Sequence, residues 1–484
     1  MRQPYKKQIT IGNTDIKEIE FDLNCRHEIT PILTGLQRIY KKRRLLGEIL
    51  DLIKQDVLGG KSEKHGAQGL CYWEILVLSA VRHGCNLDYD ALQDLANNHK
   101  KLRQMMKLGD MDIKQYSRST IQENIAKVSV ETIEKISNLV IGEGHTISPK
   151  AIERVRGDSF VVQTNVHHPT DANLILDGIT RMLILVSRLA PIFSIVGWRK
   201  HEYHRCRAKK LTRSIQRAAS SKKENKDKRL KALYQELIEF ALQITDRCKD
   251  TIATAKKCRR KKDIVANMII AELEECIRFT QTQCSLAHRR VILDEKIPHD
   301  EKVFSYFEPH TELINRGKSP YPIEFGHRVL VIQDRAGFVL KYLIMDHTTD
   351  DKVLIPVMKD LQEQYGSKII SASFDKGFWS PQNLIDLEKI VKLACLPKKG
   401  RRSKEDSERE GAPEFGKARK WHAGIESAIH ALGSGNGLAL CTDKKEKGYR
   451  RYVALGILGR NLQVLGTILH KKLKNKQKRD KKAA

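Results

Sequence analysis

A chain of 484 residues is long enough for two to four domains and a substantial hydrophobic core. Its 88 Lys and Arg against 59 Asp and Glu give a net charge of +29, which predicts a polyanionic partner, with nucleic acid favoured over membrane. No apolar run is predicted to span a bilayer, and the N-terminus lacks a signal-peptide pattern. The ten scattered Cys indicate reduced thiols in a cytoplasmic protein and exclude a disulfide framework or zinc ribbon.

Residues 1–148 are predicted to form a helical N-terminal domain. Apolar residues recur at helical spacing over 32–57, 70–83, 89–106 and 119–141. Asp88 is a candidate N-cap for the third of these helices, and Ser119 or Thr120 for the fourth. A basic helical domain is compatible with a helix-turn-helix that docks DNA and equally with a packing or dimerisation module, and the sequence does not separate the two.

The next segment, Arg154 to Thr170, has the pattern of a buried strand with a carboxylate inside it. Val155, Phe160 and Val162 are β-formers, and Asp158 lies among them. A carboxylate in a buried strand is costly unless a metal ion or a hydrogen-bond donor pairs with it. Taken alone, Asp158 is better interpreted as a satisfied structural residue, so a catalytic role requires partners elsewhere in the chain.

Residues 179–295 depart from the strand pattern and predict a basic helical insertion, with an antiparallel helical hairpin as one arrangement. Two segments are dense in Lys and Arg, 209–231 and 256–262. The second supplies candidate DNA contacts at Lys256, Lys257, Arg259, Arg260, Lys261 and Lys262. Binding to the DNA backbone and a merely solvated charged face account equally well for these runs.

A second carboxylate follows another short strand. After an antiparallel hairpin over 325–345 and a helix over 354–365, the strand pattern of 368–374 ends directly in Asp375. Ser380 can cap the helix that begins near residue 381. The carboxyl end of a strand is where α/β sheets bind ligands, so Asp375 is a candidate site residue. Asp346, Asp350 and Asp351 are competitors, but they fit turn and helix-capping positions better.

The third carboxylate is Glu426. A strand is predicted over 390–396 and a charged, mobile loop over 398–420, after which Ile425, Ile429 and Leu432 place Glu426 beside the apolar stripe of a new helix. A last helix over 452–469 precedes a basic, disordered tail, 471–484. Two strand Asp and one helix Glu form a hard-oxygen site suited to Mg²⁺ or Mn²⁺.

The order of these elements predicts an α/β fold. Apart from the insertion, it is the order of the ribonuclease H-like fold, a mixed sheet with helices on both faces, here over residues 149–178 and 296–470. In that fold the two strands that carry Asp158 and Asp375 are neighbours, so the two carboxylates can meet.

Several sequence blocks resemble the DDE transposases of bacterial insertion sequences, over roughly residues 60–470. The matching blocks are GDSFVVQTNVHHPTD at 157–171, EFGHRV at 324–329, FDKGFWS at 374–380, GIESAI at 424–429, NGL at 436–438 and GYRRYVALGILGRNL at 448–462.

The resemblance implies a function and its components. Asp158, Asp375 and Glu426 would bind two catalytic Mg²⁺ or Mn²⁺ ions and cleave and join DNA by phosphoryl transfer at the ends of an insertion sequence. The implied partners are the terminal repeats and target DNA, bound by a homodimer or higher oligomer in a bacterial cytoplasm, at the nucleoid. The alternatives are a metal-dependent nuclease of the same fold that does not join strands, and a non-catalytic DNA-binding protein.

One departure concerns the helix that bears Glu426. Many relatives place a Tyr and an Arg before the Glu and a Lys about two turns after it, whereas here His422 stands near the Arg position and Gly433 near the Lys position. The interpretations of DNA contact and of simple surface charge are equally supported for the basic residues of this region, which are Arg419, Lys420, His422, Arg450 and Arg451.

Overall fold

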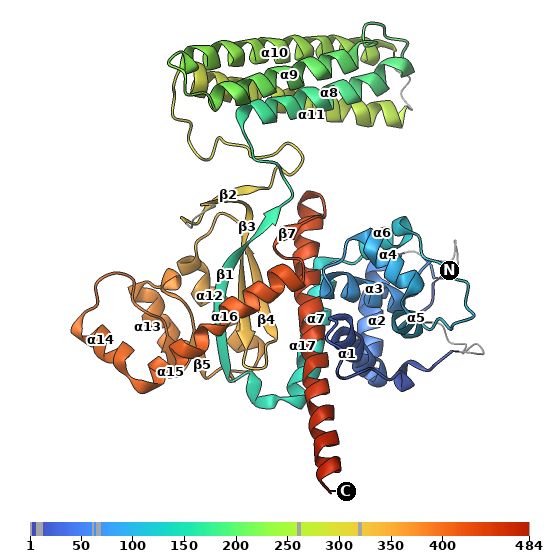
Figure 1. Cartoon of the computed structure of the whole chain (residues 1–484), viewed down its shortest axis with the longest axis vertical. Helices are drawn as coiled ribbons and strands as arrows, with labels where there is room; N and C mark the ends of the chain where they lie inside the picture. The colour runs from blue at the N-terminus through green and yellow to red at the C-terminus, as the bar shows by residue number, and fades with distance from the viewer. Residues whose placement is uncertain are drawn as a thin grey trace. The chain divides into compact units, whose positions relative to one another are not determined.

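The computed structural model describes residues 2–5, 13–60, 62–63, 69–258, 263–317 and 322–483. Residues 481–483 are described by their backbone alone. It divides into two compact units, each considered by itself (Figure 1). Unit 1 comprises Met1–Asn165 and Ile314–Ala484, and unit 2 comprises Val166–Leu313.

The strands form a seven-stranded mixed sheet, so the fold is mixed α/β. Its order is β2-β3-β1-β5-β6, with β4 paired to β3 and β7 paired to β1. β1 is antiparallel to β3 and parallel to β5 and β7. The predicted strand that contains Asp158 and the predicted strand that precedes Asp375 are therefore both present. The bounds are β1 (Arg154–Thr164), β2 (Glu312–Asn315), β3 (Ile323–Asp334), β4 (Val339–Met345), β5 (Ser371–Ser373), β6 (Leu393–Cys395) and β7 (Leu440–Cys441).

Three of the four predicted N-terminal helices are each divided in two, and in two of these cases a capping side chain starts the second helix. His99 and Ser129 each accept a hydrogen bond from a backbone N–H of the next helix and so start a new one. Asp88 caps α4 as predicted, whereas the cap of α6 is Ser117. The helices are α1 (Ile29–Lys41), α2 (Arg43–Leu58), α3 (Tyr72–Gly84), α4 (Tyr89–Asn98), α5 (Lys100–Met105), α6 (Arg118–Ile125) and α7 (Val130–Ile147).

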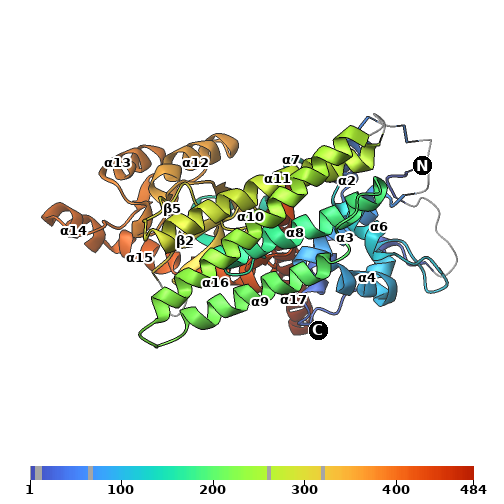
Figure 2. The ribbon, with the colours of Figure 1, turned by 90° about the horizontal axis from the view of Figure 1, so that it is seen from above.

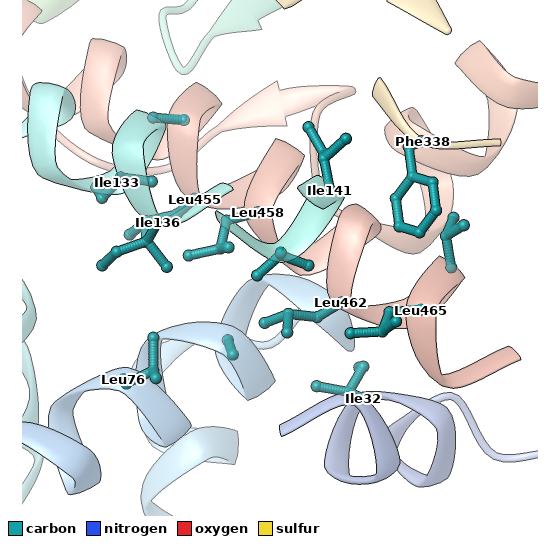
Figure 3. Close-up of a cluster of buried hydrophobic side chains, with 14 of the residues drawn as sticks. Ile32, Leu76, Ile133, Ile136, Ile141, Phe338, Leu455, Leu458, Leu462 and Leu465 are labelled. Carbon is teal, nitrogen blue, oxygen red and sulfur yellow. The ribbon is translucent and has the colours of Figure 1, made fainter. Parts of the chain in front are cut away.

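Helix α17 (Lys445–Ala483) joins these N-terminal helices to the sheet. It packs against α1, α3 and α7. Figure 3 shows Leu458 and Leu462 of α17 between Ile32 of α1 and Ile136 of α7, and all four are buried in one core cluster that also reaches the sheet. Residues 1–148 were predicted as a separate domain, but they share this core and belong to unit 1.

Two further predictions for α17 differ from the structure. No apolar run was expected to be long enough to span a bilayer, but part of α17 is long and apolar enough by length and composition. Because 72% of that window is buried inside the protein, α17 is a core helix. The tail predicted as disordered from residue 471 continues this helix to Ala483. The segment lacks Gly and Pro and is rich in Lys, which favours helix.

The segment predicted as a mobile loop over 398–420 contains two helices. Ser403 and Asp406 form a capping box that starts α14 (Lys404–Gly411), and Pro413 occupies the first turn of α15 (Pro413–His422). Phe415 and Ala418 of α15 are buried against Cys395 at the edge of the sheet. The remaining helices of unit 1 are α12 (Asp350–Gln364), α13 (Pro381–Ile390), which Ser380 caps as predicted, and α16 (Gly424–His430).

Unit 2 is a bundle of four helices, α8 (Asp171–Ile192), α9 (His201–Ala219), α10 (Lys226–Cys258) and α11 (Ile264–Ala287). α8 and α10 contact each other and both contact α9 and α11, which lie on opposite sides of that pair (Figure 2). The prediction of a helical insertion is correct in kind, but its apolar core includes Ile175 of α8, so the unit begins earlier than residue 179. Residues 259–262 of the predicted DNA-binding run, Arg259, Arg260, Lys261 and Lys262, lie outside the described residues.

Candidate carboxylate site at the edge of β5

The parallel pairing of β1 and β5 sets two of the predicted site residues at one level. Arg154 pairs with Ser371 and Arg156 with Ser373, so the same register continued by two residues opposes Asp158 to Asp375. Asp375 follows the end of β5 as predicted, whereas Asp158 lies in the middle of β1. The two carboxylates therefore meet at the end of the shorter strand.

Close packing beside the two Asp residues holds the strands in this register. Phe374 lies against Gly157, where an added Cβ would come within 2.5 Å of the Phe374 ring. Both residues are buried, and each immediately precedes one of the two Asp in sequence. Gly157 is needed because only the absence of a side chain lets Phe374 approach β1 this closely.

The electrostatic state of Asp158 shows that its environment disfavours negative charge. Burial and then the negative charge of Asp375 raise the pKa of Asp158 to about 6, while a hydrogen bond from the Ser159 backbone N–H to Oδ1, 2.7 Å long, opposes the shift. The charge of Asp375 thus disfavours ionisation of Asp158, and the two groups lie closer than repulsion between two charged carboxylates favours. A cation placed between them would relieve this repulsion.

Backbone hydrogen bonding orients the second carboxylate. The Oδ1 atom of Asp375 accepts from the backbone N–H of Gly377 at 2.8 Å, and Asp375 caps the short turn Lys376–Phe378. A Cβ at Gly377 would lie 2.9 Å from that oxygen, so a side chain there would displace it. The turn after β5 thus keeps the Asp375 side chain in one orientation.

A fourth carboxylate, Asp350 at the start of α12, belongs to this cluster, although the sequence pattern favoured a turn or helix-capping role for it. Burial is the main cause that raises its pKa, and Asp375 adds to it, whereas the Ser159 hydroxyl and Arg328 lower it. The Oδ1 atom of Asp350 is buried without a hydrogen-bond partner among the described residues. Thr349, not Asp350, occupies the N-cap position of α12. The one feature of the sequence that could have indicated this role is that Asp350 follows closely after the predicted hairpin, which returns the chain to the same edge of the sheet.

The structure places Glu426 in the first turn of α16, exposed, with Ile425 and Ala428 turned into the core. The ring of His422 lies near both Glu426 and Asp375. Burial lowers the pKa of His422, and the charges of Asp375 and Glu426 oppose that shift, so both carboxylates lie near the ring. Nδ1 of His422 is 3.1 Å from the Ser373 carbonyl, which can only accept, so Nδ1 carries the proton in that hydrogen bond.

Arg156 fixes α16 against the sheet, where α16 crosses β1 (Figure 1). Its Nη1 donates to the Trp421 carbonyl at 2.7 Å, Nε and Nη2 donate to Gln333 Oε1, and the guanidinium lies 4.7 Å from the centroid of the Trp421 ring. A Cβ at Gly424 would overlap Nη1. Arg156 and Gly424 together set where the helix of Glu426 begins.

The predicted DNA-contact residues differ in whether other groups already engage them. Arg450 pairs with Asp346 at 2.6 Å and with Glu446 at 2.9 Å, and Arg451 donates to the Ala126 carbonyl. Arg419 and Lys420 are exposed on α15 and form no ion pair within the described ranges. These two remain available to a ligand.

In unit 2, Lys256 pairs with Glu274 at 2.6 Å, while Lys257 is exposed.

Comparisons with family models, with curated proteins and with solved structures found no match to this chain. The site must therefore be interpreted from its own chemistry. Asp158, Asp375 and Asp350 crowd negative charge at one edge of the sheet, and an unpartnered carboxylate oxygen is buried among them. An all-oxygen, anionic donor set of this kind fits a hard divalent cation such as Mg²⁺ or Mn²⁺.

Proposed function

We propose that this protein is a DDE-type transposase that cleaves DNA at the ends of an insertion sequence and joins them to new DNA. The observation that carries the proposal is the nearness of Asp158, on β1, to Asp375, which follows the neighbouring parallel strand β5: burial and then the charge of Asp375 raise the pKa of Asp158. The element order supports it, because a strand with Asp, an antiparallel hairpin, a helix, a second strand with Asp and a later helix with Glu is the order of the ribonuclease H-like fold.

In this proposal the chain's own residues bind and orient the reactants. Asp158, Asp375 and Glu426 would hold two Mg²⁺ or Mn²⁺ ions, with Asp350 beside them. Such ions would supply activation of an attacking oxygen and stabilisation of the leaving 3′-oxygen in a phosphoryl displacement. His422, with its proton held on Nδ1 by the Ser373 carbonyl, lies near Asp375 and Glu426 and adds no positive charge there when it is neutral. Its lowered pKa favours that neutral form.

The substrate of the proposed reaction is double-stranded DNA. Exposed Arg419 and Lys420 on α15 lie within two helical turns of Glu426 along the chain and are suited to contact the phosphates that flank the cleaved bond. The active form in this proposal is a homodimer or larger assembly in the bacterial cytoplasm.

The test is strand cleavage and strand transfer on DNA that flanks the gene's own element, in Mg²⁺ or Mn²⁺. Asp158→Asn is expected to abolish cleavage and leave DNA binding in a mobility-shift titration nearly unchanged, because it removes charge that holds the ions and leaves the basic surface intact. Asp375→Asn is expected to behave in the same way.

Asp51→Asn is the matched control. Asp51 is exposed on α2 and forms no ion pair among the described residues. This variant is expected to cleave normally. Wild-type cleavage by Asp158→Asn would contradict the proposal, and cleavage without transfer of a 3′-end would identify the protein as a nuclease of the same fold. Binding without any cleavage by the wild type would identify a non-catalytic DNA-binding protein.

A further inference from the structure

The outer face of α9 in unit 2 gathers basic side chains on one side. Six residues of α9 are Lys or Arg, and Glu202 is its one acidic residue. Four of the six fall within roughly 100° of arc around the helix axis and along about 12 Å of its length. These four, called the α9 basic face below, are Lys209, Lys210, Arg213 and Arg217, and all are exposed.

The α9 basic face is not neutralised within its unit. Among the described residues, none of its four side chains forms an ion pair or hydrogen bond, whereas the two other basic residues of α9 do so: Arg205 pairs with Glu202 and Arg207 with Glu236. α11, which carries three Glu and one Arg, lies on the opposite side of the bundle (Figure 2). Unit 2 is therefore electrostatically polarised, with its positive side at α9.

The apolar inner face of α9 holds the helix in the bundle, so the four residues of the α9 basic face can be mutated without unfolding it. Leu211 and Ile215 are buried in the core of unit 2, on the side of the helix away from the four basic residues. Because this apolar side is already occupied by α8 and α10, α9 has no free apolar face to insert into a lipid surface, which membrane-binding amphipathic helices require.

We propose that the α9 basic face is a binding surface for the backbone of double-stranded DNA. Its four cations span a length of duplex that carries about seven phosphate charges over both strands. The wide major groove of B-DNA admits an α-helix, whereas that of duplex RNA is too deep and narrow for side chains to read. Single-stranded nucleic acid is disfavoured because Tyr203 is the one exposed aromatic residue of α9, and base stacking needs a series of them.

This inference deepens the proposed function, since it assigns to unit 2 a second DNA contact, remote in sequence from the carboxylates. It does not depend on catalysis. A protein that fails to cleave DNA still has an α9 basic face, and the two proposals have separate readouts.

The experiment measures the affinity of the full-length protein for a short DNA duplex of arbitrary sequence by fluorescence anisotropy at a series of NaCl concentrations. The test variant combines Lys209→Gln, Lys210→Gln, Arg213→Gln and Arg217→Gln. The slope of log K against log [NaCl] is expected to become shallower by about 3 to 4, which is roughly 0.9 for each of four lost phosphate contacts. Circular dichroism is expected to show unchanged helix content.

A matched control removes the same charge from the exposed end of α17, through Lys471→Gln, Lys476→Gln, Lys478→Gln and Arg479→Gln. A smaller change of slope in this control supports a specific role for α9. Equal changes in both variants, or an unchanged slope in the α9 variant, would overturn the inference, as would tighter binding of duplex RNA or anionic vesicles than of duplex DNA. If the wild-type protein does not cleave DNA but the α9 variant still shows the shallower salt slope, the result would count against the transposase proposal alone.

Discussion

Replacing Asp158 by Asn is expected to stabilise the metal-free protein. Asn matches the size of the neutral acid, and its Oδ1 can still accept from the Ser159 N–H. The pKa of Asp158 is raised from 3.8 to about 6. At roughly 1.4 kcal/mol for each pKa unit, ionised Asp158 costs the folded state about 3 kcal/mol at neutral pH. Asp158→Asn removes this cost.

The pH dependence fixes the sign of the effect. A carboxyl whose folded pKa is raised contributes stability that is fully present below its unfolded pKa and is lost as the pH rises through the folded pKa. The advantage of the Asn variant over wild type is therefore absent below pH 3.8, grows between there and about pH 6, and stays constant above it.

The assay is thermal unfolding in a metal chelator, followed by tryptophan fluorescence, because three of the four Trp lie in unit 1. Asp51→Asn, at an exposed position on α2, is the control for the change in net charge. We expect Asp158→Asn to raise the Tm by several degrees at pH 7.5 and not at pH 4. Equal Tm values for the two variants at pH 7.5, or an advantage that persists at pH 4, would refute the reasoning.

Two further predictions concern glycines and have glycine controls. Gly424→Ala is expected to displace Arg156 and the helix of Glu426 and to lower the cleavage rate roughly 10- to 100-fold with the fold retained, whereas Gly416→Ala, with open space around it on α15, leaves the rate unchanged. Equal rates would remove the positioning role of Arg156. Gly466→Ala, whose Cβ would overlap a backbone carbonyl of α1, is expected to lower the free energy of unfolding by about 1–3 kcal/mol. Gly142→Ala in α7, with no neighbour in reach, raises it by about 0.4–1 kcal/mol in the same urea titration.

The sequence predicted the parts of the site that depend on local pattern. The segments around β1 and β5 have strand patterns that contain Asp158 or lead into Asp375, and Ser380 caps the helix after the second of them, so each could be located within its own segment. The meeting of Asp158 and Asp375 followed from an expected neighbour relation between parallel strands. That the charge of Asp375 raises the pKa of Asp158 could not be predicted, because it depends on the close approach of the two segments where Phe374 packs on Gly157.

The sequence did not predict the features that depend on packing between segments far apart in the chain. Asp350 has the local pattern of a helix-start residue, and only the fold buries it beside Asp375. The charged segment over 398–420 becomes helical although only Phe415 and Ala418 of its second helix are buried, too few for a periodic pattern. The N-terminal helices were predicted as a domain because they are contiguous, whereas α17, more than 300 residues later, completes their core.

The carboxylate cluster is the place where local rules of stability are broken in this fold. Asp158 and Asp375 form no ion pair among the described residues and are held at the end of β5 by a glycine contact and by backbone hydrogen bonds, whereas Asp350 has Arg328 at 3.7 Å. Arg156, on the same strand as Asp158, turns instead to Gln333 and the Trp421 carbonyl. A sheet that needed only stability would pair these groups or replace them with apolar residues. We therefore expect that the free energy lost by ionising Asp158 in the folded protein, which Asp158→Asn restores, is lost because this site binds cations.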